Sequence, residues 1–354
     1  MNARTTTLLA ASLLLLPTLA GAAGVVEEQQ STVQQRQNEW RTIDLPSGVD
    51  APERVTDPYN SGVRGVWARI HNVNLYFAKD VGFHALDVTA RLTPKEPGGV
   101  VDLNQLQNFT VDVAHGCALV TPEQLSALFN KHILDYSPRP LNDLAITASD
   151  GALTINGEIK LWDWFPLFWM PLYLTGPITL NDAGKLVYSP EKINALKIPA
   201  RGALGATQIP LTALISLDRP GVTIDNYNIV LDVTKVFPPP AINNDPNSVE
   251  ARDDGVKICF NNRPDIDLTP PAKTGDSYIW LQAGDLAALD KLLVNGKALI
   301  RPSDGGVLSF NIPRYKSRIA ADGVLTMDAD GTLVVDLAAR SSAKNASAAG
   351  QNAQ

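Results

Sequence analysis

The sequence contains few of the side chains on which metal and redox chemistry depends. Its 354 residues include only two cysteines and four histidines. The histidines lie in separate segments of the chain, at His71, His84, His115 and His132. His115 and Cys117 lie close in sequence, but two donors are too few for a closed metal site. We therefore expect neither a metal centre nor a bound cofactor.

Catalytic signatures are also missing from the sequence. It has no HExxH or CxxC pattern and no serine within G-x-S-x-G. The glycine pairs near residues 98, 202 and 305 lack the Lys-Ser/Thr pair or downstream acidic residue of phosphate- and dinucleotide-binding loops. A hydrolase or isomerase would need a polar pocket that no pattern here indicates. We expect a protein that is not an enzyme.

Positive charge is scarce and never concentrated in a run. The chain carries 30 Lys and Arg against 37 Asp and Glu, a net charge of -7. Such an acidic chain is poorly suited to bind nucleic acid. Apolar residues make up 45% and charged residues 19%, which is an ordinary globular balance. This composition excludes a fully disordered chain, a collagen and a polytopic membrane protein.

Residues 1–22 have the pattern of a secretory signal peptide. Arg4 precedes an apolar run over residues 8–16, which Pro17 ends, and a small-x-small site follows at residues 20–22. The run is about a dozen residues, shorter than the roughly 20 that span a bilayer. We expect cleavage near Ala22 rather than an uncleaved anchor, and a periplasmic or secreted protein.

The remaining chain divides by composition. Residues 23–65 are polar and punctuated by Pro and Gly, which predicts an arm or linker, and residues 341–354 predict a disordered tail. Prolines 238–240 and the polar residues after them form either a long loop or a boundary. We expect residues 66–240 to form a sheet-and-helix domain, and residues 241–340 to complete it with strands and a helix.

Alternating apolar and polar residues predict strands over residues 86–92 and 109–113. Turn-forming residues rich in Asp and Gly separate several pairs of apolar segments, which predicts antiparallel hairpins. The paired segments are residues 144–147 with 153–155, residues 178–180 with 186–188, and residues 324–326 with 333–335.

One amphipathic helix is predicted after Thr121. The Thr121 hydroxyl can cap it, Pro122 suits its first position, and Gln124 completes a capping pattern. The apolar stripe of this helix consists of Leu125, Leu128, Phe129, His132 and Ile133. A second helix is expected over residues 284–293, and short helices around residues 191–196 and 211–217.

Six aromatic residues crowd into one short stretch. They are Trp162, Trp164, Phe165, Phe168, Trp169 and Tyr173. Pro166 and Pro171 exclude a long regular helix or a central strand here. Two interpretations stay open: a core plug packed under a helix, or an aromatic lip of an apolar cavity or membrane-contacting surface.

Export would favour a disulfide between Cys117 and Cys259, because oxidising compartments allow one to persist. Closing so long a loop contributes on the order of 4 kcal/mol in the chain-entropy model. Spacing alone does not distinguish this pair from two separate buried thiols.

Several segments together resemble a known family. They are residues 109–113 with 120–130, and then residues 140–144, 151–157, 176–180, 198–199 and 237–240. This order of strand, capped helix and glycine punctuation resembles exported bacterial proteins of unknown function related to the tubular lipid-binding (TULIP) superfamily. The resemblance implies an α+β fold: a long curled antiparallel β-sheet wrapped around one main amphipathic helix, with additional short helices. The aromatic stretch departs from the family pattern.

These observations predict an exported, non-enzymatic lipid-binding protein that holds or shuttles an acyl-containing ligand in an apolar groove. Burial contributes about 0.8 kcal/mol per methylene, so such a site needs no reactive residues. The expected lining is Leu125, Leu128, Phe129, Ile133, Phe165, Phe168, Trp169 and Tyr173. Trp162 and Trp164 are expected to contact a membrane peripherally. The alternative is an envelope scaffold or adaptor with a solid core, no ligand and an unidentified protein partner.

Overall fold

The computed structural model describes residues 65–78, 80–137, 139–160, 169–195, 211–214, 217 and 219–338. Contacts divide the chain into two units, Met1–Arg54 and Val55–Gln354, and every described residue belongs to the second. The predicted signal peptide, the predicted arm up to residue 64 and the predicted tail lie outside the described residues.

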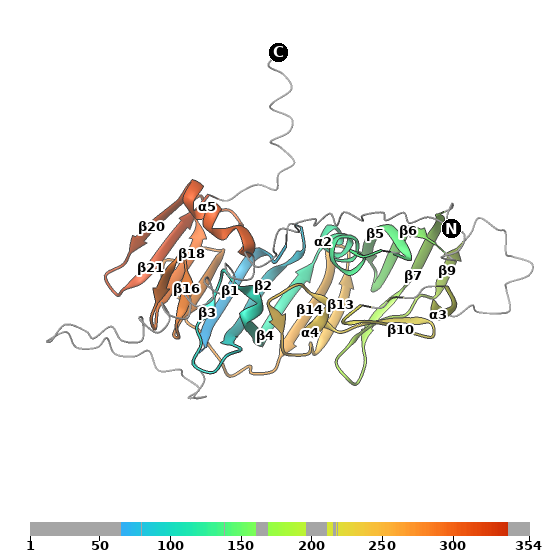
Figure 1. Cartoon of the computed structure of the whole chain (residues 1–354), viewed down its shortest axis with the longest axis horizontal. Coiled ribbons are helices and arrows are strands. Elements are labelled where there is room, and N and C mark those ends of the chain that lie inside the picture. Colours follow the sequence, from blue (N-terminus) through green and yellow to red (C-terminus); the bar gives the residue numbers. More distant parts are fainter. Residues whose placement is uncertain are drawn as a thin grey trace, which may run out of the picture. The chain divides into compact units, whose positions relative to one another are not determined.

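The described residues are mostly β-structure, and a large flat mixed sheet of 11 strands dominates them (Figure 1). Its main path runs through β13 (Ser248–Arg252), β14 (Gly255–Asn261), β4 (Phe109–Val120), β2 (Gly82–Pro94), β1 (Val66–Tyr76), β15 (Tyr278–Gln282), β18 (Lys297–Pro302), β21 (Thr332–Leu337) and β20 (Gly323–Met327). Two further strands join this path from the side: β12 (Ala241–Ile242) pairs with β4, and β19 (Leu308–Asn311) pairs with β1.

Strand direction within this sheet is mixed. The pairs β1–β19, β4–β12 and β18–β21 are parallel, and the other pairs along the sheet are antiparallel. Each parallel pair joins strands that are distant in sequence or separated by other elements. Such pairs require crossover connections rather than tight hairpins.

Two smaller sheets accompany the large one. The seven-stranded sheet consists of β10 (Val222–Asp225), β11 (Asn228–Leu231), β8 (Leu186–Tyr188), β7 (Met170–Leu180), β6 (Ala152–Ile159) and β5 (Leu141–Ser149), with β9 (Lys192–Ala195) beside β7. The three-stranded sheet consists of β17 (Lys291–Leu293), β16 (Leu286–Ala288) and β3 (Val101–Asp102).

The helices of the described residues are few and short. They are α2 (Pro122–Leu128), the π-helix η2 (Phe129–Ile133), α3 (Leu211–Leu214), α4 (Val233–Val236), α5 (Tyr315–Asp322) and the 3₁₀ turns η1 (Leu106–Asn108) and η3 (Ile312–Arg314). The predicted start of the first helix is confirmed. Gln124 N–H donates to Thr121 Oγ1 over 3.3 Å, and Thr121 N–H donates to Gln124 Oε1 over 3.0 Å.

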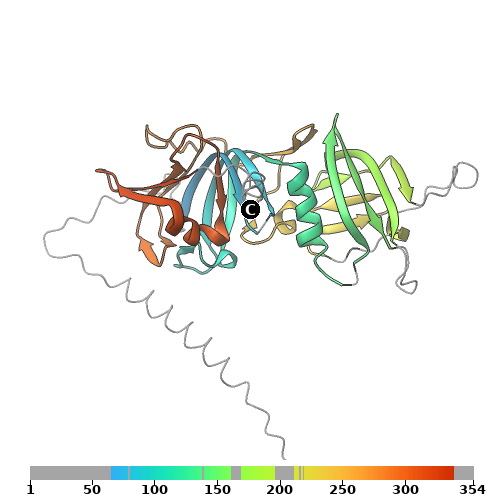
Figure 2. The same cartoon turned by 90° about the horizontal axis from the view of Figure 1, so that it is seen from above.

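The predicted fold, a long curled antiparallel sheet wrapped around one main amphipathic helix, is wrong. The large sheet is flat and mixed, and no curled sheet is present among the described residues. The helical turns from Pro122 to Ile133 are only about 18 Å long at 1.5 Å per residue. They lie beside β5 at one edge of the seven-stranded sheet (Figure 2), so no sheet is wound around them.

The three predicted hairpins are confirmed as β5–β6, β7–β8 and β20–β21. The helix predicted over residues 284–293 is wrong, because this segment forms the β16–β17 hairpin. Leu289 and Asp290 take positive φ angles of 53° and 58° at its turn, which a helix does not allow. The short helix expected around residues 191–196 is strand β9, whereas α3 does fall within residues 211–217.

Strand alternation separates the two faces of the large sheet. One face carries Ala90, Val88 and Ile279, which belong to two large buried clusters that contain most of the apolar core. On the opposite face, Trp67 and Trp280 pack in a smaller cluster with residues from the segment between β14 and β15. The first face is the one that bounds the candidate site.

Candidate functional site

A cavity of about 110 Å³ lies against the inner face of the large sheet. Every side chain that lines it is apolar. The lining comes from β1, β2, β4, β14, β15, β18, β19 and α4, with residues beside them, and includes Ile70, Phe83, Ala90, Val111, Ile279 and Phe310. Ile70, Phe83 and Val111 keep partly accessible surface although they face the interior. We call this the sheet cavity.

A second, smaller cavity of about 40 Å³ lies between α2 and the seven-stranded sheet. Leu125, Leu128 and Phe129 of the predicted apolar stripe line it, together with Leu153 and Leu186 of the sheet. We call this the helix cavity. Ile133 is buried in the same core cluster but does not line either cavity.

The helix cavity contains one polar group near its wall. Tyr188 lines this cavity, and its hydroxyl donates to the backbone carbonyl of Leu153 over 3.3 Å. Burial raises the pKa of the Tyr188 hydroxyl, with a further contribution from Tyr173. Because the hydroxyl is uncharged and bonded, the cavity presents an apolar surface to any occupant.

Part of the predicted aromatic lining can be located. Trp162, Trp164, Phe165 and Phe168 lie outside the described residues. Trp169 and Tyr173 are 39% and 37% exposed, and Tyr173 lies on the outward face of β7. Leu172 and Leu174 of the same strand are buried. Neither Trp169 nor Tyr173 lines the sheet cavity or the helix cavity.

None of the predicted lining residues that the structure describes is among those that line the sheet cavity. The signal was present as alternation in β2 and β4, which predicted one buried face for each strand. Alternation does not reveal which strands share a sheet, and β15 and β18 lie far from β2 in sequence. The apolar stripe of the helix is a stronger local signal, and for that reason the predicted residues that do line a cavity lie at the smaller, helix cavity.

A charged network holds the short helix α4, whose Val233 lines both cavities. Asp232 caps this helix: Asp232 Oδ1 accepts from Thr234 N–H over 3.0 Å and from Lys185 Nζ over 3.1 Å. Lys235 Nζ lies 3.2 Å from Asp232 Oδ2, and Lys185 also donates to Asp245 over 2.7 Å. Burial raises the pKa of Asp232, but the hydrogen bonds from these partners outweigh it and lower the pKa to about 2.

The opposite face of the large sheet carries a second set of charges. Arg69 forms a two-point contact with Asp87, with Nε–Oδ1 and Nη2–Oδ2 distances of 3.2 and 3.1 Å. Arg69 also donates to the Leu268 carbonyl over 3.2 Å, which ties the segment before β15 to the sheet. The hydrogen bond to Asp87 is the main cause that raises the pKa of Arg69. These contacts stabilise the fold on the side away from the cavities.

The described residues offer little for metal binding or general acid–base chemistry. Within them, no three or more His, Cys, Asp or Glu side chains are grouped to hold a metal ion. His84 Nδ1 lies 3.0 Å from Asn74 Oδ1, and His115 Nε2 lies 2.6 Å from the Ile266 carbonyl. Burial lowers the pKa values of His84 and His132. The side chains that line the sheet cavity are all apolar, and those of the helix cavity are apolar apart from the Tyr188 hydroxyl.

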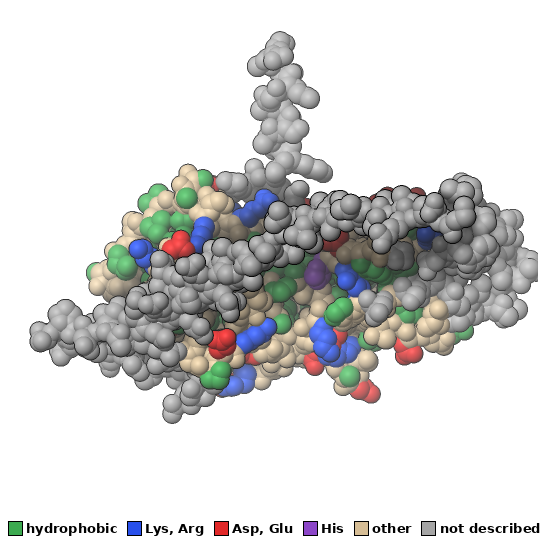
Figure 3. All heavy atoms as spheres, in the orientation of Figure 1, with side chains coloured by type: hydrophobic (Ala, Val, Ile, Leu, Met, Phe, Trp, Pro, Cys, Tyr) green, Lys and Arg blue, Asp and Glu red, His purple; other side chains and the backbone are tan. Residues whose placement is uncertain are grey.

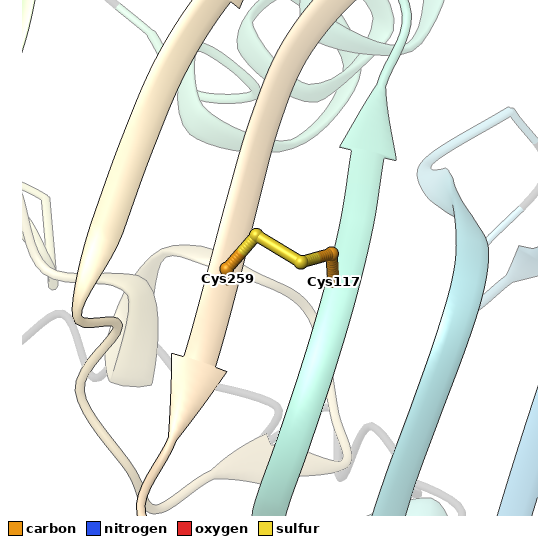
Figure 4. Close-up of a disulfide and its surroundings, with 2 residues drawn as sticks. All are labelled: Cys117 and Cys259. Carbon is orange, nitrogen blue, oxygen red and sulfur yellow. A yellow bond between two sulfur atoms is a disulfide. The ribbon is translucent and has the colours of Figure 1, made fainter.

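Cys117 and Cys259 form a disulfide between β4 and β14 (Figure 4). The two cysteines face each other directly in the antiparallel register. Ala118 and Phe260, which follow them on these strands, line the sheet cavity. The disulfide therefore fastens two cavity-lining strands from their other face.

The charged surface and the helices of the described residues add no further binding site. In the described part of the face in Figure 3, acidic and basic side chains are interspersed rather than gathered by sign. None of the helices in the described ranges has the length and apolar character needed to cross a bilayer. Comparisons with protein-family models, curated proteins and solved structures found no match to this chain.

Proposed function

We propose that the protein binds the hydrocarbon part of an acyl-containing ligand in the sheet cavity and holds or shuttles it without chemical change. The observation that carries this proposal is an interior cavity of about 110 Å³ with an entirely apolar lining. An apolar cavity of about 150 Å³ stays dry and takes up benzene. By the same measure the sheet cavity has room for about four carbon atoms, the end of a chain rather than a whole lipid.

The energy of such binding comes from transfer of methylene groups out of water. Each buried methylene contributes about 0.8 kcal/mol, and an empty apolar cavity makes no competing hydrogen bonds to water. The lack of reactive groups around the cavity fits a carrier better than a catalyst. The disulfide supports an exported location, because disulfides persist in oxidising compartments.

Native mass spectrometry of gently purified protein, paired with mass spectrometry of its organic extract, tests this function. The expected result is a stoichiometric adduct whose extract contains an acyl chain. Delipidated protein should then take up added dodecanoic acid at one molecule per chain. A clean apo mass, with no uptake of fatty acid or phospholipid, would contradict the proposal.

A second candidate is a scaffold that packs on a protein partner, and one surface favours it. Strand β20 is an edge strand of the large sheet, and Val324, Leu325 and Met327 are 60%, 45% and 63% exposed. Figure 3 shows hydrophobic side chains at this end of the sheet. Exposed edge strands with apolar side chains are templates for added strands. A protein that fails to take up any acyl chain but has a partner whose binding is lost in Leu325→Lys would support this candidate.

A further inference from the structure

The sheet cavity and the helix cavity meet at one boundary. Four residues line both of them: Val120, Val233, Phe237 and Ile258. No polar side chain is among these four. The side chains that border both cavities are therefore all apolar.

Two of the boundary residues belong to a rigid wall. Val120 ends β4 and Ile258 lies within β14, and these strands pair in antiparallel register. The Cys117–Cys259 disulfide joins the same strands on the opposite face. This side of the boundary is therefore fixed by backbone pairing and a covalent bond.

The other side of the boundary depends on α4 and the residue after it. Val233 is held by the helix that Asp232 caps, and the ion pairs with Lys185 and Lys235 fasten that helix. Phe237 follows the helix in extended conformation. Its ring makes an edge contact with Phe83, at 6.1 Å between centroids and an interplanar angle of 83°.

Phe237 is thus the boundary residue with the largest side chain, and it alone of the four lies outside a helix or strand. It is only partly buried, and the only ring contact that involves it among the described residues is with Phe83 of the sheet cavity. The other three boundary side chains are branched aliphatics on paired strands or a capped helix.

We propose that Phe237 is a partition between the two cavities that sets the length of acyl chain the protein accepts. This inference rests on the proposed function and names its ligand class as a single unbranched alkyl chain. Short chains end against the Phe237 ring in the sheet cavity. Longer chains displace the ring and enter the helix cavity between Val120, Val233 and Ile258, where a ring system or two parallel chains would not fit.

The test is affinity against chain length, measured with delipidated full-length protein and saturated fatty acids of increasing length. Affinity should rise about fourfold per methylene, which corresponds to about 0.8 kcal/mol, until the available cavity is full. Beyond that chain length, which we call the levelling point, affinity should no longer rise with added methylenes. Phe237→Ala should move the levelling point to longer chains by a few carbons, and Phe237→Trp should move it to shorter ones.

Two further variants test whether Phe237→Ala lengthens the accepted chain by opening the helix cavity or only by loosening the packing of the core. In Phe237→Ala/Leu186→Trp, the indole fills the helix cavity, so the gain at long chains should disappear. Ile319→Ala removes a buried side chain that lines neither cavity. Its levelling point should match the wild type despite its lower stability. If Phe237→Ala does not fold, Phe237→Leu takes its place in the same experiment.

The outcomes distinguish this inference from the proposed function. If the wild type binds no chain of any length, the proposed function fails and the partition fails with it. If the wild type binds but Phe237→Ala and Phe237→Leu keep its levelling point, the function stands and the partition is overturned. A shift in Phe237→Ala that survives Leu186→Trp would also overturn it, because the added length would then lie elsewhere.

Discussion

The side chain of Asn130 makes both of the hydrogen bonds that a neighbouring strand would offer to Leu144. Its Nδ2 donates to the Leu144 carbonyl over 2.7 Å, and the Leu144 N–H donates to Oδ1 over 2.9 Å. Leu144 lies on β5, the last strand on its side of the seven-stranded sheet. The Asn130 side chain thus forms the two backbone hydrogen bonds that a residue of an adjacent strand would otherwise form with Leu144.

Ser126, one helical turn before Asn130, also hydrogen-bonds to the backbone of β5. Ile146 N–H donates to Ser126 Oγ over 2.9 Å, while the Ser126 hydroxyl donates to the Pro122 carbonyl over 2.8 Å. The exposed edge of a sheet normally presents unpaired donors and acceptors. Here α2 and η2 cover that edge, and their apolar stripe closes the helix cavity at the same time.

Asn130→Ala should destabilise the protein by roughly 1–3 kcal/mol, because it leaves the buried Leu144 N–H and carbonyl without these partners. Asn130→Asp keeps the acceptor for Leu144 N–H but sets a carboxylate oxygen against the Leu144 carbonyl, so it should cost at least as much. Urea denaturation measures both. Asn156→Ala, at an exposed position of β6, is the matched control and should have little effect. Equal losses in the three variants would contradict the edge-covering role.

The start of this helix could be predicted from sequence, but its role at the sheet edge could not. The capping pattern at Thr121 and Gln124 is local, so it was readable without a structure. Asn130 has no such signature, because its partner is chosen by the placement of β5. A polar residue beside an apolar stripe appears as ordinary solvent-facing surface in a sequence.

The β16–β17 hairpin shows a different limit. Leu286, Leu289 and Leu293 suit a helix by spacing, and no glycine interrupts them. The turn is made by Leu289 and Asp290 at positive φ, a conformation that is an outlier for most side chains. The hairpins with Asp-Gly turns were predictable because glycine accepts that conformation freely.

The sheet cavity escaped prediction for a topological reason. Its lining combines Ile70 and Val88 from the start of the described chain with Ile279 and Ile300 from its last third. Alternation predicted the strand over residues 86–92, which contains Val88, but no pattern marked Ile70, Ile279 or Ile300. Partner choice between distant strands, including the parallel pairs, is not encoded in any local pattern. The curled fold was implied by the family resemblance, whose segments are local and do not determine how distant strands pair.

Asp232 should make stability fall in acid. Its folded pKa, about 2, lies below the ordinary value of 3.8, so its contribution is fully present above about pH 4. That contribution is lost as the pH falls from about 4 toward 2, because the carboxylate of the unfolded chain binds a proton in this range while the folded carboxylate stays charged, which favours unfolding. Asp232→Asn should be less stable than the wild type at pH 7 and should show a flatter decline between pH 4 and 2.

The measurement is the free energy of unfolding in urea at a series of pH values. Asp253→Asn, at the exposed β13–β14 turn, is the control and should follow the wild-type curve. A wild-type decline that Asp232→Asn reproduces in full would show that other carboxylates cause it. Asp232→Asn should also weaken acyl binding, because Asp232 caps α4 and α4 carries Val233 at the cavity boundary.

The Cys117–Cys259 disulfide should contribute about 5 kcal/mol to stability in the chain-entropy model, since it closes a loop with a sequence separation of 142. Cys117→Ala/Cys259→Ala should lower the urea midpoint, and a reducing agent should lower the wild-type midpoint to the same value. The double variant should not respond to the reducing agent. A response in that variant would show that the agent acts on something other than this bond.

Ala90→Leu and Ala298→Leu make the same chemical change in buried positions on the same face of the large sheet. Ala90 lines the sheet cavity and Ala298 does not. Leucine at 90 has empty space to fill, so stability should hold or rise by about 1 kcal/mol, while the occupied space weakens acyl binding. Leucine at 298 enters a packed region and should cost roughly 1–3 kcal/mol. Similar losses at both positions would show that the sheet cavity is not available space.

Gly116 should be far less tolerant of a side chain than Gly151, although both have positive φ angles, of 120° and 79°. A Cβ at 116 would lie 2.0 Å from the Asp87 carbonyl oxygen of β2, beside the irregular pairing of β2 with β4. A Cβ at 151, in the β5–β6 turn, would meet nothing within 4 Å. Gly151→Ala should therefore cost about 1 kcal/mol for its backbone conformation alone. Gly116→Ala should cost roughly 3 kcal/mol or more, because β2 and β4 must also separate. Since both strands line the sheet cavity, Gly116→Ala should weaken acyl binding as well. The urea midpoint measures stability, and equal effects of the two substitutions on it would contradict the close approach of β2 to Gly116.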